Sequence, residues 1–336
     1  MPSLERESHR IVIAGASSLL GAELKSLLEE SKFAGWDFRL LDEEEVAGTL
    51  TEAGGEPAVI QPVEDGSFDK ARFIFFTGSP EFVQKNTAVA RKSRGQMIDL
   101  SGASTTQTDT EPWFPHLERL RGSNLELDAS LYLIPSALAV AAAMLSYALE
   151  PLGLQWLSFV GFQPVSDAGR AGIEELESQT GQLLSFQPVG QPIFDTQVAF
   201  NMAANYGAQS RHKLRAVRQR VFEEMQLSLP PKGNIPTVQI IHAPVFYGST
   251  FSATAELQGG LEVRQLSEAC AKAGFQLLQD GEQGPTNLSA AGENVIQLAC
   301  PERANWTGKR WLLWGAADNI RFRAWNALKL AEKLAG

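Results

Sequence analysis

The feature of this sequence that most restricts its fold is a strand, a turn of small residues and a helix near its start. RIVIAG, at residues 10–15, is an apolar and β-branched run that ends in glycine. GAELKSLLEESK, at residues 21–32, follows with apolar residues at helical spacing. A buried strand that leads through such a turn into a helix is the first unit of a parallel sheet with helices on its faces.

The same alternation continues along the first part of the chain. Short apolar runs separated by helical or loop segments recur at residues 37–42, 57–62, 71–78 and 95–102. From about residue 154 the runs of strand character become longer, as in LQWLSFVGFQPV, TVQIIHAPVFYG and TFSATAEL. They stand beside helical segments, which favours an α+β domain with an antiparallel or mixed sheet.

These patterns predict an α/β chain of two domains. We expect a Rossmann domain over residues 1–133 and an α+β domain over residues 134–315. The closing stretch ADNIRFRAWNALKLAEKL has its apolar residues on one helical face, and we expect a helix within 316–336 to complete the first domain.

Composition excludes several classes of function. The 336 residues carry a formal charge of −10, which argues against a nucleic-acid or anionic-membrane surface. No apolar run approaches the ~20 residues that cross a bilayer, and MPSLERESHR is unlike a secretory signal, so we expect a cytoplasmic protein. Cys270 and Cys300 form no CxxC pair, and the four histidines lack metal-ligand spacing, so no metal site is expected.

The first turn, AGASSLLG, has the glycine pattern of a dinucleotide site. Gly15 and Gly21 stand at its outer positions and Ser18 at the middle one, where a side chain would meet the pyrophosphate. A plain turn that binds nothing remains an equal alternative. Asp42 and the three glutamates after it, at 43–45, end the second strand, where their charge disfavours the 2′-phosphate of NADP. Asp42 could accept hydrogen bonds from the ribose of NAD, or the run could simply be solvated.

Several longer stretches together resemble the aspartate-semialdehyde dehydrogenase family over nearly the whole chain. They are AGASSLLG, FFTGSPEFV, IDLSGAS, IPSALAVA, FQPVSDAGRAGIEEL, QVAFNM, HAPVFYG and ADNIRF. The resemblance implies a Rossmann domain that binds NADP, a second α+β domain that supplies the catalytic groups, and a dimer. It also implies oxidation of aspartate semialdehyde to aspartyl phosphate through a cysteine thioester, with a histidine as base.

The residue types that this chemistry needs are missing from the matching positions. The resemblance places the catalytic cysteine at Ala137, the histidine base at Ser249, the substrate-binding arginine at His242 and a phosphate-binding arginine at Thr105. Alanine cannot form a thioester, and serine cannot act as a base near neutral pH. Ser136 remains available to cap the helix that begins here.

Other positions of the resemblance are kept. Gln163 matches a glutamine that orients the intermediate, and Lys213 a basic substrate contact. Ser166, Gly169 and Asn319 match positions close to the cofactor, although the middle glycine of that loop is here Asp167. Each also has a structural reading, in which Gln163 ends a strand, Gly169 starts a helix and Asn319 caps the last helix.

We therefore expect a homologue without the phosphorylating dehydrogenase reaction, with a regulatory or scaffolding role. It would form a homodimer or associate with an active family member. An NAD-dependent oxidoreductase of different chemistry and a metabolite sensor are the alternatives. A serine nucleophile at Ser136, served by His242 and Ser249, would need a bulge, because residues seven apart on a regular strand face opposite sides.

Overall fold

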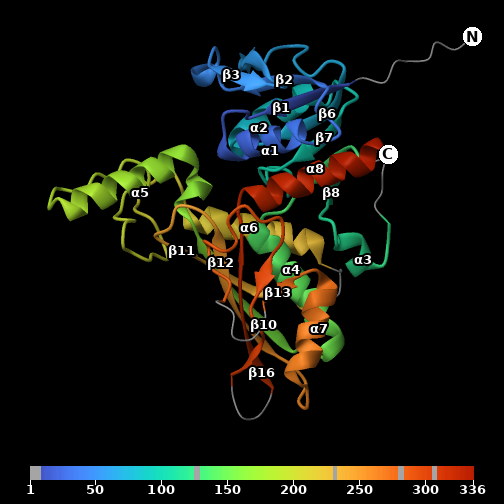
Figure 1. The fold of residues 1–336 in the computed structure, drawn as a ribbon, viewed down its shortest axis with the longest axis vertical. Coiled ribbons are helices and arrows are strands. Elements are labelled where there is room, and N and C mark those ends of the chain that lie inside the picture. The colour runs from blue at the N-terminus through green and yellow to red at the C-terminus, as the bar shows by residue number, and fades with distance from the viewer. Residues whose placement is uncertain (1–8, 125–128, 230–232, 279–283, 305–308) are drawn as a thin grey trace, which may run out of the picture. The chain divides into compact units, whose positions relative to one another are not determined.

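The chain forms two compact units (Figure 1). The computed structural model describes residues 9–124, 129–229, 233–278, 284–304 and 309–336. As far as these residues go, the first unit takes in Met1–Pro115, Leu125–Ile134 and Arg323–Gly336, and the second takes in His116–Asn124 and Pro135–Phe322.

The first unit is built on a parallel sheet, as the alternation of strands and helices predicts. Every strand pair in it is parallel. In spatial order the strands are β5 (Gln61–Pro62), β2 (Asp37–Asp42), β1 (Arg10–Ala14), β6 (Ala71–Phe76), β7 (Gln96–Asp99), β9 (Leu131–Leu133) and β8 (Thr110–Pro112). The mixed α/β architecture with a Rossmann-like first unit is thereby confirmed.

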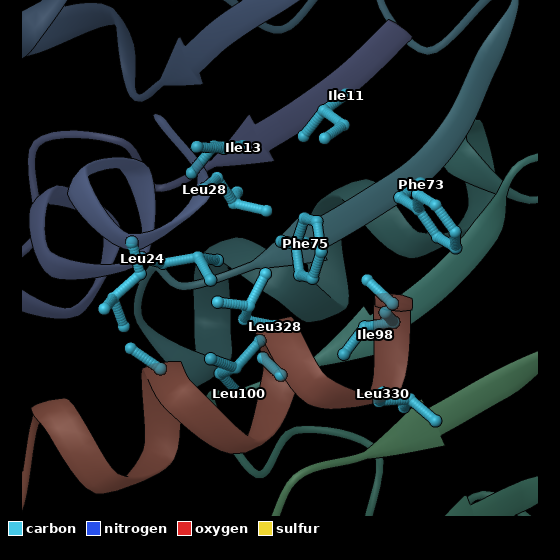
Figure 2. Close-up of a cluster of buried hydrophobic side chains, with 14 of the residues drawn as sticks. Ile11, Ile13, Leu24, Leu28, Phe73, Phe75, Ile98, Leu100, Leu328 and Leu330 are labelled. Atoms are coloured by element: carbon cyan, nitrogen blue, oxygen red, sulfur yellow. The ribbon is translucent and has the colours of Figure 1, made fainter. Parts of the chain in front are cut away.

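Both faces of this sheet are buried, which explains the unbroken apolar run of β1. Ile11 and Ile13 point to one face and pack with α1 (Leu19–Glu29) and α8 (Arg321–Ala335). Figure 2 shows Ile13 beside Leu28 of α1, and Phe75 of the neighbouring strand directed towards Leu328 of α8. The alternate residues of β1 point to the other face, where α2 (Pro80–Ala90) contributes its buried apolar side chains.

One predicted strand forms differently. The run at residues 57–62 is divided between β5 in the main sheet and β4 (Glu56–Val59). β4 pairs antiparallel with β3 (Leu50–Ala53) as a separate hairpin, with Gly54 and Gly55 at its turn in the left-handed region. The apolar run alone could not reveal the change of partner. A short 3₁₀ turn, η1 (Glu44–Val46), precedes the hairpin.

The second unit contains a mixed sheet, as predicted from its longer strand-like runs. β10 pairs parallel with β11, whereas β12 and β16 pair antiparallel with their neighbours. The strands in spatial order are β11 (Thr237–His242), β10 (Trp156–Gln163), β12 (Ser249–Glu256), β16 (Arg310–Ala317), β14 (Gln297–Leu298) and β13 (Gln276–Leu277), with β15 (Glu302–Arg303) paired to β16.

Helix α4 (Ala137–Leu149) lies at the centre of this unit. All of its residues except Tyr147 are buried, which is typical of a helix that is apolar on every side. It packs on β10 and β12, where the absence of a side chain at Gly161 leaves room for Leu138. Its other neighbours are α6 (Leu214–Ser228) and α7 (Val263–Ala273).

The remaining helices of the second unit are shorter or more exposed. They are α3 (Leu117–Arg121), α5 (Gly169–Leu184) and the 3₁₀ turns η2 (Glu150–Leu152) and η3 (Val165–Ala168). Across the described part of the chain, no helix is both long and apolar enough to span a bilayer.

Candidate functional site

The N-terminus of α4 holds the position at which the sequence predicts a missing nucleophile. Ala137 is the first residue of the helix, and its side chain is 3% exposed. The residue before it, Ser136, has the extended backbone of an N-cap, with φ −63° and ψ 156°. The helix begins where the sequence predicts, and a methyl group occupies its first side-chain position.

Ser136 does not cap α4 with its hydroxyl, contrary to expectation. Its backbone N–H and its hydroxyl both donate to Oε2 of Glu224, at 2.8 Å and 2.5 Å. Glu224 comes from α6 and is fully buried. A carboxylate from a neighbouring helix therefore lies at the positive end of α4, and it binds the hydroxyl that the sequence assigns to the cap.

His242 is a core residue with both ring nitrogens occupied. Its side chain is fully buried at the end of β11. Nε2 lies 3.2 Å from the carbonyl oxygen of Val198, and Nδ1 lies 3.2 Å from the hydroxyl of Tyr206. Because a carbonyl only accepts, Nε2 carries a proton. In the neutral imidazole, Nδ1 then accepts from the tyrosine hydroxyl.

Burial favours the neutral forms of His242 and Tyr206. It lowers the pKa of His242, although the carbonyl of Val198 opposes part of that effect. It raises the pKa of the Tyr206 hydroxyl far above its usual range, with the charges of Asp167 and Glu175 acting in the same direction. His242 therefore offers no cation for a substrate carboxylate and no free nitrogen for a serine nucleophile.

Ser249 and His242 lie on different strands, so the expectation that they face opposite sides of one strand is wrong. β11 ends at His242 and β12 begins at Ser249, and the segment that connects them contains Gly248 at φ +81°. β10 lies between these strands, and its Gln163 pairs with His242. Two strand spacings, about 10 Å, separate His242 from Ser249. Gln163, His242 and Ser249 are all buried at one end of the sheet. Ser136, the third member of the conceivable serine triad, bonds Glu224 instead of His242.

Asn319 ties together two loops of the second unit. Its Oδ1 accepts from the N–H of Gly248 at 3.0 Å, and its Nδ2 donates to the hydroxyl of Ser166 at 3.1 Å. The cap expected of Asn319 is supplied instead by Asp318, whose Oδ1 accepts from the N–H groups of Ile320 and Arg321. Asn319 therefore holds loop geometry, and the helix cap, which was one of its two readings from the sequence, falls to Asp318.

Ser166, Asp167 and Gly169 form the turn between β10 and α5. Gly169 begins α5, as predicted, with φ +73° and ψ −162°, a conformation that excludes other residue types. Asp167, which replaces a glycine of the resembled loop, pairs with Arg220 of α6 at 3.2 Å. Lys213 stands just before α6, and its ammonium donates to the carbonyls of Gly207 and Ala208.

The glycine turn of the first unit is closely packed. Gly15 has φ +97°, and a β-carbon there would lie 2.1 Å from the nitrogen of Gly78. Ser18 caps α1, since its Oγ accepts from the N–H of Gly21 and donates to the carbonyl of Thr77, both at 2.9 Å. The Ser18 side chain is thus directed to the cap and supplies an acceptor for one N–H group of the first turn, whereas the N–H groups before it have no intrahelical acceptor. This end of α1 fits an anion such as a pyrophosphate.

Asp42 is part of the same turn. It is 7% exposed, and its two oxygens accept from the N–H groups of Ser17 at 2.8 Å and Glu43 at 2.9 Å. The three glutamates that follow, at 43–45, are exposed. These negative charges follow directly after the end of β2, where the sequence predicts an acidic group of side chains.

The loop after β7 is organised by a carboxylate that the sequence did not identify as important. Asp99 is fully buried and accepts four hydrogen bonds, from the N–H and hydroxyl groups of Ser101 and Ser104. Thr105, at the position of the expected phosphate-binding arginine, follows this loop and is half-buried. The Asp–x–Ser spacing was the available signal for this local network.

Glu224 is the residue of this site that sequence reasoning missed. The buried residues of α6 include Val217, Val221, Met225 and Ser228, and Glu224 falls on the same helical stripe. A carboxylate on an apolar stripe was the signal, but its partner on another helix could not be identified from spacing. Among the residues that the structure describes, no cluster of three or more metal-ligating side chains occurs.

Comparison with known proteins gives one family match and full-length relatives. Residues 147–322 match the model described as semialdehyde dehydrogenase, dimerisation domain, which is more than half of the 336 residues. A USG-1 protein homolog of Pseudomonas aeruginosa is 28% identical over 329 residues, covering 96% of this chain and 97% of that protein.

Solved structures agree with this match. A probable aspartate-semialdehyde dehydrogenase from Pseudomonas aeruginosa superposes with a TM-score of 0.83 at 28% identity, covering 97% of this chain and 98% of that one. An aspartate-semialdehyde dehydrogenase from Candida albicans, solved with NADP, shares the fold with a TM-score of 0.63 at 12% identity, covering 97% of each chain.

Proposed function

This chain belongs to the semialdehyde dehydrogenase family, and from that premise we propose that it has lost the phosphorylating dehydrogenase reaction while keeping the fold. Its role is then regulatory or scaffolding, exercised through association with a second subunit. The observation that carries the proposal is Ala137, a buried methyl group at the first position of α4. No acyl group can be held there as a thioester.

The surroundings of Ala137 support the same conclusion. The hydroxyl next to it, on Ser136, is already bonded to Glu224. The positions of the base and of the substrate arginine are Ser249 and the neutral, fully enclosed His242. Gln163 and Lys213 are retained, but neither can act as nucleophile and base together. Replacing one group would therefore not restore the reaction.

The proposal is tested by assaying the purified chain with aspartate semialdehyde, phosphate and NADP or NAD. We expect no formation of reduced cofactor above that of a mock purification from the same host carrying no gene for the chain. An active aspartate-semialdehyde dehydrogenase serves as the positive control. If the enzymatic activity per milligram of the protein stays constant through two successive chromatography columns, the activity belongs to the protein and the proposal is overturned.

A second candidate, an NAD-dependent oxidoreductase of different chemistry, is supported by Asp42. Its carboxylate stands at the glycine turn, and the neighbouring Glu43, Glu44 and Glu45 would repel the 2′-phosphate of NADP. When bound, a nicotinamide cofactor would supply hydride transfer. Gly15, Ser18 and Gly21 would shape the turn under the pyrophosphate.

Thermal-shift titration separates this candidate from a scaffold. NAD should raise the melting temperature in a saturable way, NADP should not, and Asp42→Asn should weaken the NAD effect. The asparagine of this variant still has one oxygen that can accept from the N–H of Ser17, so we expect the variant to keep the glycine turn. If neither dinucleotide shifts the transition, the scaffold remains and this candidate fails.

We also propose a homodimer formed through the side of the mixed sheet that faces away from α4. The alternate residues of β10 and β16 that point there include Trp156, Leu312 and Trp314, which are 46%, 41% and 39% exposed. Large half-exposed aromatic side chains on one sheet face are typical of association surfaces. Glu256 and Arg310, paired at 3.1 Å, stand at one end of that face.

The same face would serve hetero-association with an active family member. Analytical ultracentrifugation of the chain alone should give a dimer at micromolar concentration. Co-expression with a tagged active aspartate-semialdehyde dehydrogenase should then show whether mixed dimers form. A monomer in the first experiment would contradict the homodimer.

A further inference from the structure

The outer edge of β2, in the first unit, is only partly covered by a neighbouring strand. β5 pairs with β2 at Leu41 and Asp42, the last two residues of β2. Just before this pairing the chain turns away, because the backbone of Ile60 bonds Gly48 and Thr49 and makes no pair with β2. Among the residues that the structure describes, the part of β2 before Leu41 therefore has no strand on its outer side.

The hydrogen bonds between β2 and β1 show which backbone groups the open edge presents. The N–H of Asp37 donates to the carbonyl of His9 at 2.8 Å, and the carbonyl of Leu41 accepts from the glycine turn at 2.8 Å. Since neighbouring residues of a strand direct their backbone groups to opposite edges, Phe38 and Leu40 direct theirs away from β1. The register of β5 uses the carbonyl of Leu40, which leaves both groups of Phe38 and the N–H of Leu40 without a partner in the described part of the chain. Unpaired groups of this kind are a template for another strand.

An edge groove runs along this open part of β2. It has a volume of about 280 Å³ and is lined by Phe38, Arg39 and Leu40 of β2 and by Ala58, Val59 and Gln61 of β4 and β5. Paired strands lie about 4.8 Å apart, so an extended chain in the edge groove is within hydrogen-bonding reach of β2. Val59 is 45% exposed and Phe38 is half-buried, so the edge groove also offers apolar contacts.

The charged side chains of the edge groove favour an acidic occupant. Asp37 also lines the groove, but its carboxylate is paired with Arg10 at 2.5 Å. Arg39 donates through Nη1 to the carbonyls of Gly66 at 3.2 Å and Ser67 at 2.9 Å. These acceptors are neutral, and no carboxylate within the described ranges bonds the Arg39 guanidinium. A carboxylate from another chain would therefore gain a charge-assisted hydrogen bond there.

We propose that the edge groove binds an extended segment of a partner protein, which adds to β2 as a further strand and carries acidic side chains alternating with apolar ones. Addition to a sheet edge gives affinity through main-chain hydrogen bonds and specificity through alternate side chains. Arg39 and Phe38 are neighbours in β2 and point to opposite faces of the sheet. The acidic side chains would meet Arg39 on one face, and the apolar ones would meet Phe38 on the other. This surface belongs to the first unit, so it is separate from the sheet face proposed for the dimer and does not depend on loss of the dehydrogenase reaction.

The test is fluorescence polarisation of the full chain with a short, labelled and capped peptide in which glutamate and valine alternate. A strand presents its N–H groups to its two edges in alternation, so methylation of the glutamate nitrogens blocks one edge and methylation of the valine nitrogens blocks the other. The glutamate nitrogens face β2 if the added strand is parallel, and the valine nitrogens face it if the added strand is antiparallel. One methylated peptide should therefore lose binding, and the other should bind as the parent peptide does. Equal binding of both methylated peptides, or loss of binding by both, would overturn the inference.

Arg39→Gln tests the preference for acidic side chains, since its amide still donates to a carbonyl but carries no charge. It should weaken binding of the parent peptide by about tenfold or more. Arg264→Gln is the matched control, because it removes an exposed arginine of α7 in the second unit, and it should leave binding unchanged. Equal affinity of the two variants would overturn the inference, as would displacement of the peptide by inorganic phosphate at constant ionic strength, which would indicate a site for small anions. If Arg39→Gln fails to fold, the two methylated peptides still decide the question on the unmodified chain. None of these outcomes depends on whether the chain turns over aspartate semialdehyde.

Discussion

Replacing His242 by arginine, the residue type that the family resemblance places there, should destabilise the protein strongly. The side chain at this position is fully buried between two oxygen atoms, the carbonyl of Val198 and the hydroxyl of Tyr206. Phe194 and Tyr206 cover it with their rings, at centroid distances of 6.1 and 5.6 Å. A guanidinium is always charged and carries five N–H donors.

The magnitude follows from counting donors against acceptors. If each of the two oxygens takes one donor, three N–H groups remain, and each buried unpaired donor costs about 1–3 kcal/mol. The three unpaired donors cost at least about 3 kcal/mol, and burial of the charge adds to this, so we expect His242→Arg to lower the free energy of unfolding by at least about 4 kcal/mol. His242→Gln keeps one donor and one acceptor and should cost about 1 kcal/mol. His242→Phe fills the volume but leaves both oxygens unpaired, at about 2–3 kcal/mol.

Urea unfolding followed by tryptophan fluorescence and far-UV circular dichroism measures these differences. The expected order of stability is wild type, glutamine, phenylalanine and then arginine, with similar denaturant slopes. If arginine proves as stable as glutamine to within about 1 kcal/mol, the position has access to solvent or to a carboxylate. The interpretation of His242 as an enclosed core residue would then be refuted.

Three further predictions concern pH, the loop after β7 and assembly. Burial lowers the pKa of His242 and of His116, so both side chains bind protons less readily in the folded protein than in the unfolded chain. Their contribution to the free energy of unfolding should therefore be at its maximum above about pH 6.5, the usual pKa of histidine, and should decrease as the pH falls below it. The decrease should be smaller in His242→Gln. Asp99→Asn turns one acceptor oxygen into a donor that faces two donors, and calorimetry should show a loss of about 2–4 kcal/mol. Trp314→Glu should shift sedimentation towards monomer, whereas Leu50→Glu, at a more exposed apolar residue in the hairpin of the first unit, should not; equal behaviour of the two variants would contradict the proposed interface.

Much of the fold could be predicted because it depends on local periodicity. The unbroken apolar run of β1 indicates burial on both faces, and the alternation in β10 and β12 indicates a sheet with one covered face. The start of α4 at Ala137 follows from Pro135, the extended Ser136 and the alanine-rich run behind them. The run at residues 57–62 could not be assigned in this way, because pairing with a hairpin partner depends on contacts outside the run.

The site was predictable only as a set of positions. The resemblance identified where a nucleophile, a base and an arginine would stand, and the substituted residue types there are plain in the sequence. What these residues do instead depends on neighbours that are far away in the chain. Glu224 reaches Ser136 across 88 positions, and Tyr206 reaches His242 across 36. No spacing rule links residues on separate elements at such distances.

The sequence by itself therefore determined most of the longer elements, their order and the absence of a thiol at residue 137. Each of these follows from residue type or from a period of two or 3.6 residues. Only the tertiary structure decided the charge and hydrogen-bond state of the site: the carboxylate at the end of α4, the neutral imidazole and the amide of Asn319 between two loops. These depend on burial and on which donors meet which acceptors, and both arise only when helices and strands pack together.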